Sequence, residues 1–336
     1  MRYAKLVLKW LITSLVVGFV AWEFMRQWSR FPEGAWRLEI EWLMLSGLIY
    51  IVAFLPSFGY WTWCLHRLGQ PTPFGAILRA YFVGHLGKYV PGKALVPVLR
   101  AALLQSVRVH PAAAVLAVFC ETLTCMAAGS FLVAVLLAIF EDAGAWSREL
   151  FELRGQSWNS PRWFFWATIG GFALLGWVML VPLVPAGFNR LADWLLRPTV
   201  RDNRVSMQGL SLHMFLCGLL VGIATWMLLG LSHLAAIEAV APVAWTGNQF
   251  WLVTLSGTAA VVLGFVSLLP GGIGVREGVL AFLLARTEIV GAPQAALVAV
   301  LVRVVWLISE VVVAAGLLAP HVLQWLSGSR ERREAP

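Results

Sequence analysis

One short segment combines helix-breaking residues with a permanent positive charge. Between Pro270 and Gly278 the sequence reads Pro-Gly-Gly-Ile-Gly-Val-Arg-Glu-Gly. A proline and four glycines prevent a continuous helix and expose backbone N–H groups at the start of the next one. The forked guanidinium of Arg276 suits phosphate, and Glu277 can balance its charge when no ligand is bound. A tight interhelical turn, whose arginine merely reaches toward water, is the alternative. The pattern predicts an anion site formed by Gly271, Gly272, Gly274 and Arg276.

A second break lies in a basic stretch nearer the N-terminus. Pro91 and Gly92 interrupt an apolar run there, and the basic residues around them are His85, Lys88, Lys93 and Arg100. A cytoplasmic loop that follows the positive-inside rule explains these charges equally well. It does not explain the Pro-Gly pair, which implies backbone that lines a cavity or packs within protein. We therefore add Lys93 and Arg100 to the predicted lipid-phosphate-binding residues.

Three ionised residues, Glu121, Arg303 and Glu310, interrupt otherwise apolar runs. An arginine at the centre of a membrane helix costs roughly 2.5–3.5 kcal/mol on insertion scales, so these side chains should face the interior of a bundle. Arg303 and Glu310 are seven residues apart and share one helix face. With Glu277, these residues are predicted to line an intramembrane polar path. The alternative is a structural ion pair between helices, such as Glu121 with Arg303.

Other chemistry finds no support in the residue pattern. The sequence has no Ser/His/Asp arrangement, no HExxH and no phosphate-binding P-loop, and its six histidines are scattered without ligand spacing. None of the four cysteines is in a CxxC pair. We expect no catalytic residue, no metal and no cofactor, and hence a protein that is not an enzyme.

The elements that must position these residues are membrane helices. The chain has 336 residues, of which 60% are hydrophobic and 12% charged. Each charge-free stretch between Arg162 and Arg190, Arg204 and Glu238, and Glu238 and Arg276 exceeds the roughly 20 residues that span a bilayer. The fold class is therefore all-α, a polytopic bundle of about seven to nine helices. Clear spans are predicted at 6–25, 42–65, 111–140, 162–185, 209–236, 249–269 and 294–319.

Two apolar segments, 71–105 and 271–291, are broken by proline, glycine and charge. Each is a re-entrant hairpin, a short crossing or an interfacial helix, and a C-terminus on the cytoplasmic side requires 271–291 to cross fully. The two breaks resemble each other, and similar helices follow them, which suggests repeats at about 42–140 and 209–319. Chance similarity between apolar segments is the alternative. Duplicated halves with a broken helix in each are a common way to build a transport site at mid-membrane.

The domain prediction is one membrane domain over 1–326 and a disordered, cytoplasmic polar tail over 327–336. Lysine and arginine gather in the loops after the second and fourth spans, so those loops and the N-terminus are predicted to be cytoplasmic. The formal charge of +8 thus reflects anchoring in the cell's inner (plasma) membrane rather than nucleic-acid binding. The oligomeric state is open.

These features resemble a flippase-like family related to the transmembrane region of lysylphosphatidylglycerol synthases, which includes hopanoid-associated members. The matching residues are Gly87-Lys-Tyr-Val-Pro-Gly-Lys93 with Arg100, Glu121, Pro270-Gly-Gly-Ile-Gly-Val-Arg-Glu277, and Arg303. The chain departs from the family pattern at Thr122, where a basic residue is expected. The resemblance implies an integral membrane protein whose partners are membrane lipids and which moves an anionic lipid or lipid-linked headgroup between leaflets. The full synthases add an aminoacyl transferase domain, which we expect this chain to lack.

Two other functions stay open. A small-anion channel or secondary transporter could also use glycine-rich helix starts aimed at mid-membrane. A membrane-embedded transferase acting on polyprenyl-linked substrates would need a catalytic carboxylate, for which Glu121, Glu277 or Glu310 could serve.

Overall fold

The computed structural model of the chain describes residues 38–89, 95–140, 162–183, 211–243, 245–287 and 289–334. Within these ranges it is all-α and contains no strand, which confirms the predicted fold class. The predicted first span, 6–25, lies outside the described residues. The elements are α2 (Ile40–Arg67), α3 (Phe74–His85), η1 (Leu86–Tyr89), α4 (Leu95–Leu104), η2 (Gln105–Val107), α5 (Pro111–Ile139), α7 (Arg162–Leu180), η4 (Val181–Leu183), α9 (Leu212–Glu238), α10 (Gly247–Val266), η5 (Pro270–Gly272), α11 (Val275–Leu284) and α12 (Ala292–Glu334).

In the described part of the chain, six helices are long and apolar enough to cross a membrane. They correspond to the six predicted spans from 42–65 onward, with ends that differ by a few residues. Local signals set several of these ends: α5 begins with Pro111 in its first turn, and Thr246 and Gln249 form a capping box at the start of α10. The chain is therefore a multi-pass membrane protein.

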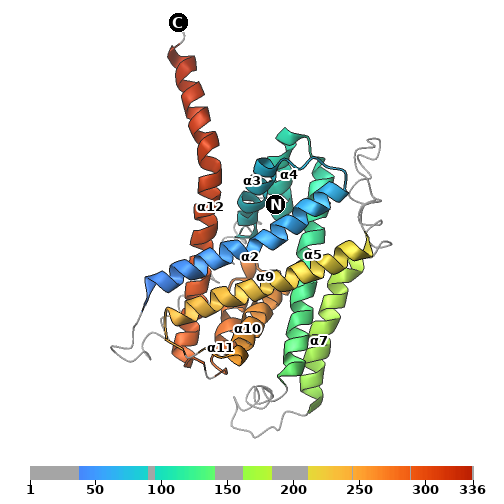
Figure 1. The fold of residues 1–336 in the computed structure, drawn as a ribbon, viewed down its shortest axis with the longest axis vertical. Helices are drawn as coiled ribbons and strands as arrows, with labels where there is room; N and C mark the ends of the chain where they lie inside the picture. The colour runs from blue at the N-terminus through green and yellow to red at the C-terminus, as the bar shows by residue number, and fades with distance from the viewer. Residues whose placement is uncertain are drawn as a thin grey trace, which may run out of the picture.

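The helices pack through small and weakly polar residues. α2 and α9 run alongside each other (Figure 1), and the hydroxyl of Ser46 donates to the carbonyl of Ser232 at 2.8 Å. In return, the Ser232 hydroxyl donates to the Ser46 carbonyl at 2.9 Å. Such reciprocal bonds are favourable where lipid offers no alternative partner.

Both broken segments contain a half-length helix. At 1.5 Å per residue the ten-residue helices α4 and α11 are each about 15 Å long, half the thickness of a bilayer's hydrocarbon core. Within 71–105, α3 packs against α4, which favours a re-entrant hairpin. In 271–291, α11 packs back against α10, the apolar span that precedes it, and against α12. We call α3–α4 and α10–α11 the two hairpins. Figure 1 shows α3 and α4 at the end of the bundle where α5 begins, and α10 and α11 at the opposite end, where α12 begins.

Glycine backbone conformation accounts for the second break. Gly271, Gly272 and Gly274 all have positive φ, at 56°, 69° and 84°. A helix cannot continue through successive residues in this left-handed region, which residues with a Cβ rarely enter.

The same order of elements occurs twice. A long helix, a broken hairpin and a second long helix are α2, α3–α4 and α5 in the first case and α9, α10–α11 and α12 in the second. This order fits the predicted repeats, whose origin by duplication stays a prediction. At the C-terminal end, α12 continues to Glu334, and arginine and glutamate, which are good helix formers, dominate its last turns. The predicted disordered tail over 327–336 stays a prediction.

Candidate functional site

The two helix breaks meet beside the middle of α12. The guanidinium of Arg303 lies over the Tyr89 ring, 5.1 Å from its centroid, and contacts Gly271 in η5. η1 and η5 are themselves in contact. Residue 306 is midway along the apolar span Ala292–Pro320, so Arg303 and Glu310 both lie within about 6 Å of its centre along the helix axis. The described parts of both breaks therefore lie together.

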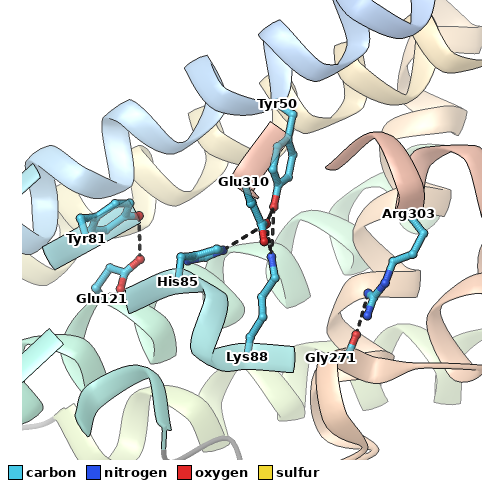
Figure 2. Close-up of polar contacts among 8 residues, drawn as sticks. All are labelled: Tyr50, Tyr81, His85, Lys88, Glu121, Gly271, Arg303 and Glu310. Atoms are coloured by element: carbon cyan, nitrogen blue, oxygen red, sulfur yellow. Dashed lines mark hydrogen bonds and ion pairs between the residues drawn. The ribbon is translucent and has the colours of Figure 1, made fainter. Parts of the chain in front are cut away.

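At the first break, Lys88 reaches across to the second half of the protein. Its ammonium forms an ion pair with Glu310 on α12 and donates to the Tyr50 hydroxyl on α2 at 3.1 Å (Figure 2). Tyr50 in turn donates to the same carboxylate oxygen, Oε1, and Nε2 of His85 lies 3.8 Å from it. Glu310 is only 5% exposed, whereas the Lys88 side chain is 22% exposed. The pair thus joins α12 to the tip of the first hairpin.

At the second break, Arg303 holds the turn. It donates from Nη1 to the Gly271 carbonyl at 2.8 Å, and its Nε lies 3.5 Å from Oε1 of Glu277. Oε2 of Glu277 accepts from the Gly274 N–H at 2.7 Å. Glu277 therefore caps α11 and pairs with Arg303, whereas the sequence suggested that it would balance Arg276.

The predicted amide cradle is largely closed by its own turn. The Gly274 N–H donates to Glu277, and the Gly272 N–H donates to the Leu269 carbonyl at 3.0 Å. These two amides consequently have acceptors within the protein in this structure, and a role for the glycines in holding a phosphate stays a prediction. Gly272 instead allows close packing, because a Cβ there would lie 3.0 Å from the Cα of Gly264.

Arg276 differs from its neighbours in having no acceptor for part of its guanidinium. Its Cζ lies 4.4 Å from the centroid of the Trp306 ring, which stacks on Tyr50 at 4.3 Å. Its Nη2 is buried, and no described residue accepts a hydrogen bond from it. Oε2 of Glu310 is likewise buried without a donor among the described residues. A buried group left without a partner costs about 1–3 kcal/mol, more if it is charged.

Arg100 and Glu121 form a separate, enclosed pair. Nη1 of Arg100 lies 2.9 Å from Oε2 of Glu121, and the Tyr81 hydroxyl donates to Oε1 at 3.1 Å. The Arg100 guanidinium packs on the rings of Trp61 and Tyr81, at 4.7 and 4.1 Å from their centroids. Arg100 is only 1% exposed, so in this conformation it is not accessible to a lipid phosphate. The alternative pairing of Glu121 with Arg303 is also wrong, because each has a different partner.

The structure thus sorts the predicted residues. One group lies around the two helix breaks: Gly271, Arg276, Glu277, Arg303 and Glu310. Arg100 and Glu121 lie apart from this group, in the enclosed pair. The predictions for Pro91, Gly92 and Lys93 concern residues outside the described ranges, and the side chain of Pro270 is not described either. Sequence reasoning missed the aromatic residues Tyr50, Tyr89 and Trp306. The only available signal was a tyrosine hydroxyl inside an apolar span.

Comparison with known proteins agrees with this architecture. The family described as lysylphosphatidylglycerol synthase TM region matches residues 6–314, which is most of the chain. No curated protein matches it significantly.

Proposed function

Because the chain belongs to the lysylphosphatidylglycerol synthase TM region family, we propose that it binds an anionic lipid or lipid-linked headgroup and moves it between the leaflets of a membrane. The observation that carries this proposal is Arg276, whose buried Nη2 lacks an acceptor beside two helix breaks near the middle of an apolar span. A phosphate oxygen supplies the missing acceptor in the geometry that a guanidinium prefers.

The arrangement of the hairpins supports transport rather than static binding. Three helices, α5, α7 and α9, separate the two hairpins in the chain. If each of the three crosses the membrane once, the α3–α4 hairpin and the α10–α11 hairpin enter from opposite sides of the membrane. Figure 1 agrees with this count, since the hairpins approach from opposite ends of the bundle. Inverted halves with broken helices that meet at mid-membrane allow a site to open alternately to each side. A headgroup would cross through the polar cluster while its acyl chains stay in lipid.

The same count supports the orientation predicted from the loop charges. With the N-terminus cytoplasmic and span 6–25 crossing, the first hairpin enters from the cytoplasmic side and α12 ends there. If α10 and α11 together enter and leave the membrane on one side, the C-terminus is cytoplasmic as well, although α10 alone is long enough to cross. The membrane we propose is the cell's inner membrane.

Two other functions use the same residues. A small-anion transporter would place a free anion on Arg276, so it differs from a lipid translocase only in what it moves. A transferase needs a reactive carboxylate, whereas Glu121, Glu277 and Glu310 are each paired with a cation. We therefore propose transport without a catalytic step.

The test is leaflet exchange in reconstituted vesicles. Phosphatidylcholine vesicles containing fluorescent phosphatidylglycerol report exchange as the fraction of probe that a membrane-impermeant reductant can reach. A hydrogen bond to a charged group contributes about 1.5–3 kcal/mol, so Arg276→Ala should weaken probe recognition roughly tenfold or more. Arg286→Ala is the matched control, because it removes an arginine just after α11 that stacks on Phe282 outside the cluster. Unchanged exchange in Arg276→Ala refutes the assigned role, and phosphate flux without lipid exchange favours the small-anion transporter.

A further inference from the structure

The charges of the polar cluster do not cancel. The cluster comprises the cations Lys88, Arg276 and Arg303 and the carboxylates Glu277 and Glu310, all connected through the contacts described above. Arg100 and Glu121 neutralise each other and do not enter the count. Over the residues that the structure describes, the cluster thus carries one positive charge in excess.

His85 is the remaining titratable group beside Glu310. Its ring is packed against Phe54 and Tyr81, and the cations Lys88, Arg100 and Arg276 all act on it. Burial disfavours a charged ring, and repulsion by these cations adds to that, so we count it as neutral. His233 packs on Trp306 and bonds to the Leu229 carbonyl in its own helix, without a contact to the charged residues.

An uncompensated charge is expensive at this depth. The cluster lies near the centre of the apolar α12 span, where little water is present to solvate an excess charge. A headgroup that enters it is therefore favoured when its own charge offsets the excess. A headgroup with one negative charge leaves the occupied cluster neutral, whereas a zwitterionic headgroup leaves one positive charge and a dianionic headgroup leaves one negative charge.

We propose that the substrate is a phospholipid whose headgroup has a net charge of −1, a phosphodiester, and that the Lys88–Glu310 pair sets this preference. The inference rests on the proposed function and narrows it. Phosphomonoesters, with two negative charges, and aminoacylated headgroups, with a net positive charge, would both leave the occupied cluster charged. Both are therefore disfavoured. Lys88 and Glu310 act as specificity-determining residues because each changes the count by one without belonging to the Arg276 phosphate contact.

The experiment compares headgroups of different charge in one vesicle assay. Fluorescent phosphatidylglycerol, phosphatidylcholine and a long-chain polyprenyl monophosphate present charges of about −1, 0 and −2. In the wild-type protein, exchange of phosphatidylglycerol should exceed the other two at least about tenfold. An aminoacylated phosphatidylglycerol, with a net positive charge, should be the poorest probe.

Charge-changing variants should shift the preference in opposite directions. Glu310→Gln keeps the size of the side chain, raises the excess to two and should favour the monophosphate. Lys88→Met keeps the length of the stem, removes the excess and should favour phosphatidylcholine. The double variant restores an excess of one and should return to phosphatidylglycerol. It also removes both members of a buried ion pair, which is better tolerated than removing one.

Matched controls make the same charge changes elsewhere. One control is Glu238→Gln at the end of α9, where the wild-type carboxylate accepts from the Trp245 indole N–H. The other is Arg286→Met, just after α11. Neither should alter the order of the three probes. The charge preference is refuted if the wild-type protein moves all three lipids equally well, or if the variants keep the wild-type order of probes. Either result leaves the proposed lipid translocation standing. Failure of the wild-type protein to move any of the lipids refutes the proposed function itself.

Discussion

Removing the Glu121 carboxylate should leave the Arg100 guanidinium charged and buried with no counter-ion. Arg100 is 1% exposed, and its aliphatic stem packs so closely on α3 that a Cβ at Gly84 would lie 2.5 Å from its Cγ. The side chain therefore has no room to swing toward water when its partner is lost. We choose Glu121→Leu, which removes the charge and keeps most of the volume.

The expected loss of stability follows from the contacts. An unpaired buried charge costs about 3–5 kcal/mol, and the Tyr81 hydroxyl also loses its acceptor, which costs about 1–3 kcal/mol. The stacking of Arg100 on Trp61 and Tyr81 is present in both the wild type and this variant, so it does not change the difference. The single variant should thus lose about 4–8 kcal/mol. The double variant Arg100→Met/Glu121→Leu contains no buried charge and should lose only about 2–5 kcal/mol, for the Tyr81 hydroxyl and for the lost stacking of the guanidinium.

Unfolding in mixed detergent micelles, followed by tryptophan fluorescence, measures these free energies. The two single variants and the double variant form a cycle whose coupling energy should be at least about 2 kcal/mol. Additive losses would show that Arg100 and Glu121 do not act as a pair, and the interpretation of this cluster as a structural clamp would be wrong. Arg303→Met/Glu277→Leu is the matched comparison, and its coupling should be smaller because that pair is longer and more exposed.

Three further predictions concern the helix breaks. Gly271→Ala should destabilise the protein by about 1–2 kcal/mol and slow lipid exchange, because φ is 56° and a Cβ would lie 2.5 Å from Nη2 of Arg303. Unfolding and exchange assays measure the two effects, and an unchanged exchange rate would contradict the prediction. Lys88→Met should lose about 3–5 kcal/mol by leaving Glu310 unpaired, and the added Glu310→Gln should recover most of that loss in the same unfolding assay. Gly87→Ala should force η1 away from α4, because a Cβ would lie 2.8 Å from the backbone N of Val96; reduced thermal stability is expected, and none would show that the hairpin adjusts freely.

Most of the fold was predictable because the apolar runs are long and almost free of charge. The prediction of a span at 42–65 corresponds to the helix Ile40–Arg67, and similar agreement holds through the last span. Whether the half-length helices α4 and α11 cross the membrane could not be predicted, for a physical reason. A crossing helix and a re-entrant one are equally apolar, and only packing against α3 or α10 distinguishes them.

The site was predictable in its parts but not in its pairings. A charge in an apolar run is costly, which identified Glu121, Arg303 and Glu310 without an alignment. Which cation each carboxylate meets depends on how the helices are placed side by side, and a single sequence carries no signal for that. Tyr50 was missed for a related reason, since a tyrosine in an apolar span is ordinary until its hydroxyl is found on Glu310.

Glu121 and Arg303 each lie in the long helix that follows a helix break, and the structure explains why one is an acid and the other a base. Each half-helix is attached to the long helix that follows it by one Arg–Glu pair, with the charges reversed between the halves. Arg100 on α4 meets Glu121 on α5, whereas Glu277 on α11 meets Arg303 on α12. The reversal opposes exchange of the hairpins, because α4 against α12 would place arginine on arginine and α11 against α5 would place glutamate on glutamate. The first pair packs on aromatic rings, while the second is longer and lies beside Arg276, whose Nη2 has no acceptor among the described residues. We therefore expect the α10–α11 hairpin to be the less firmly held and the better placed to move when a headgroup binds.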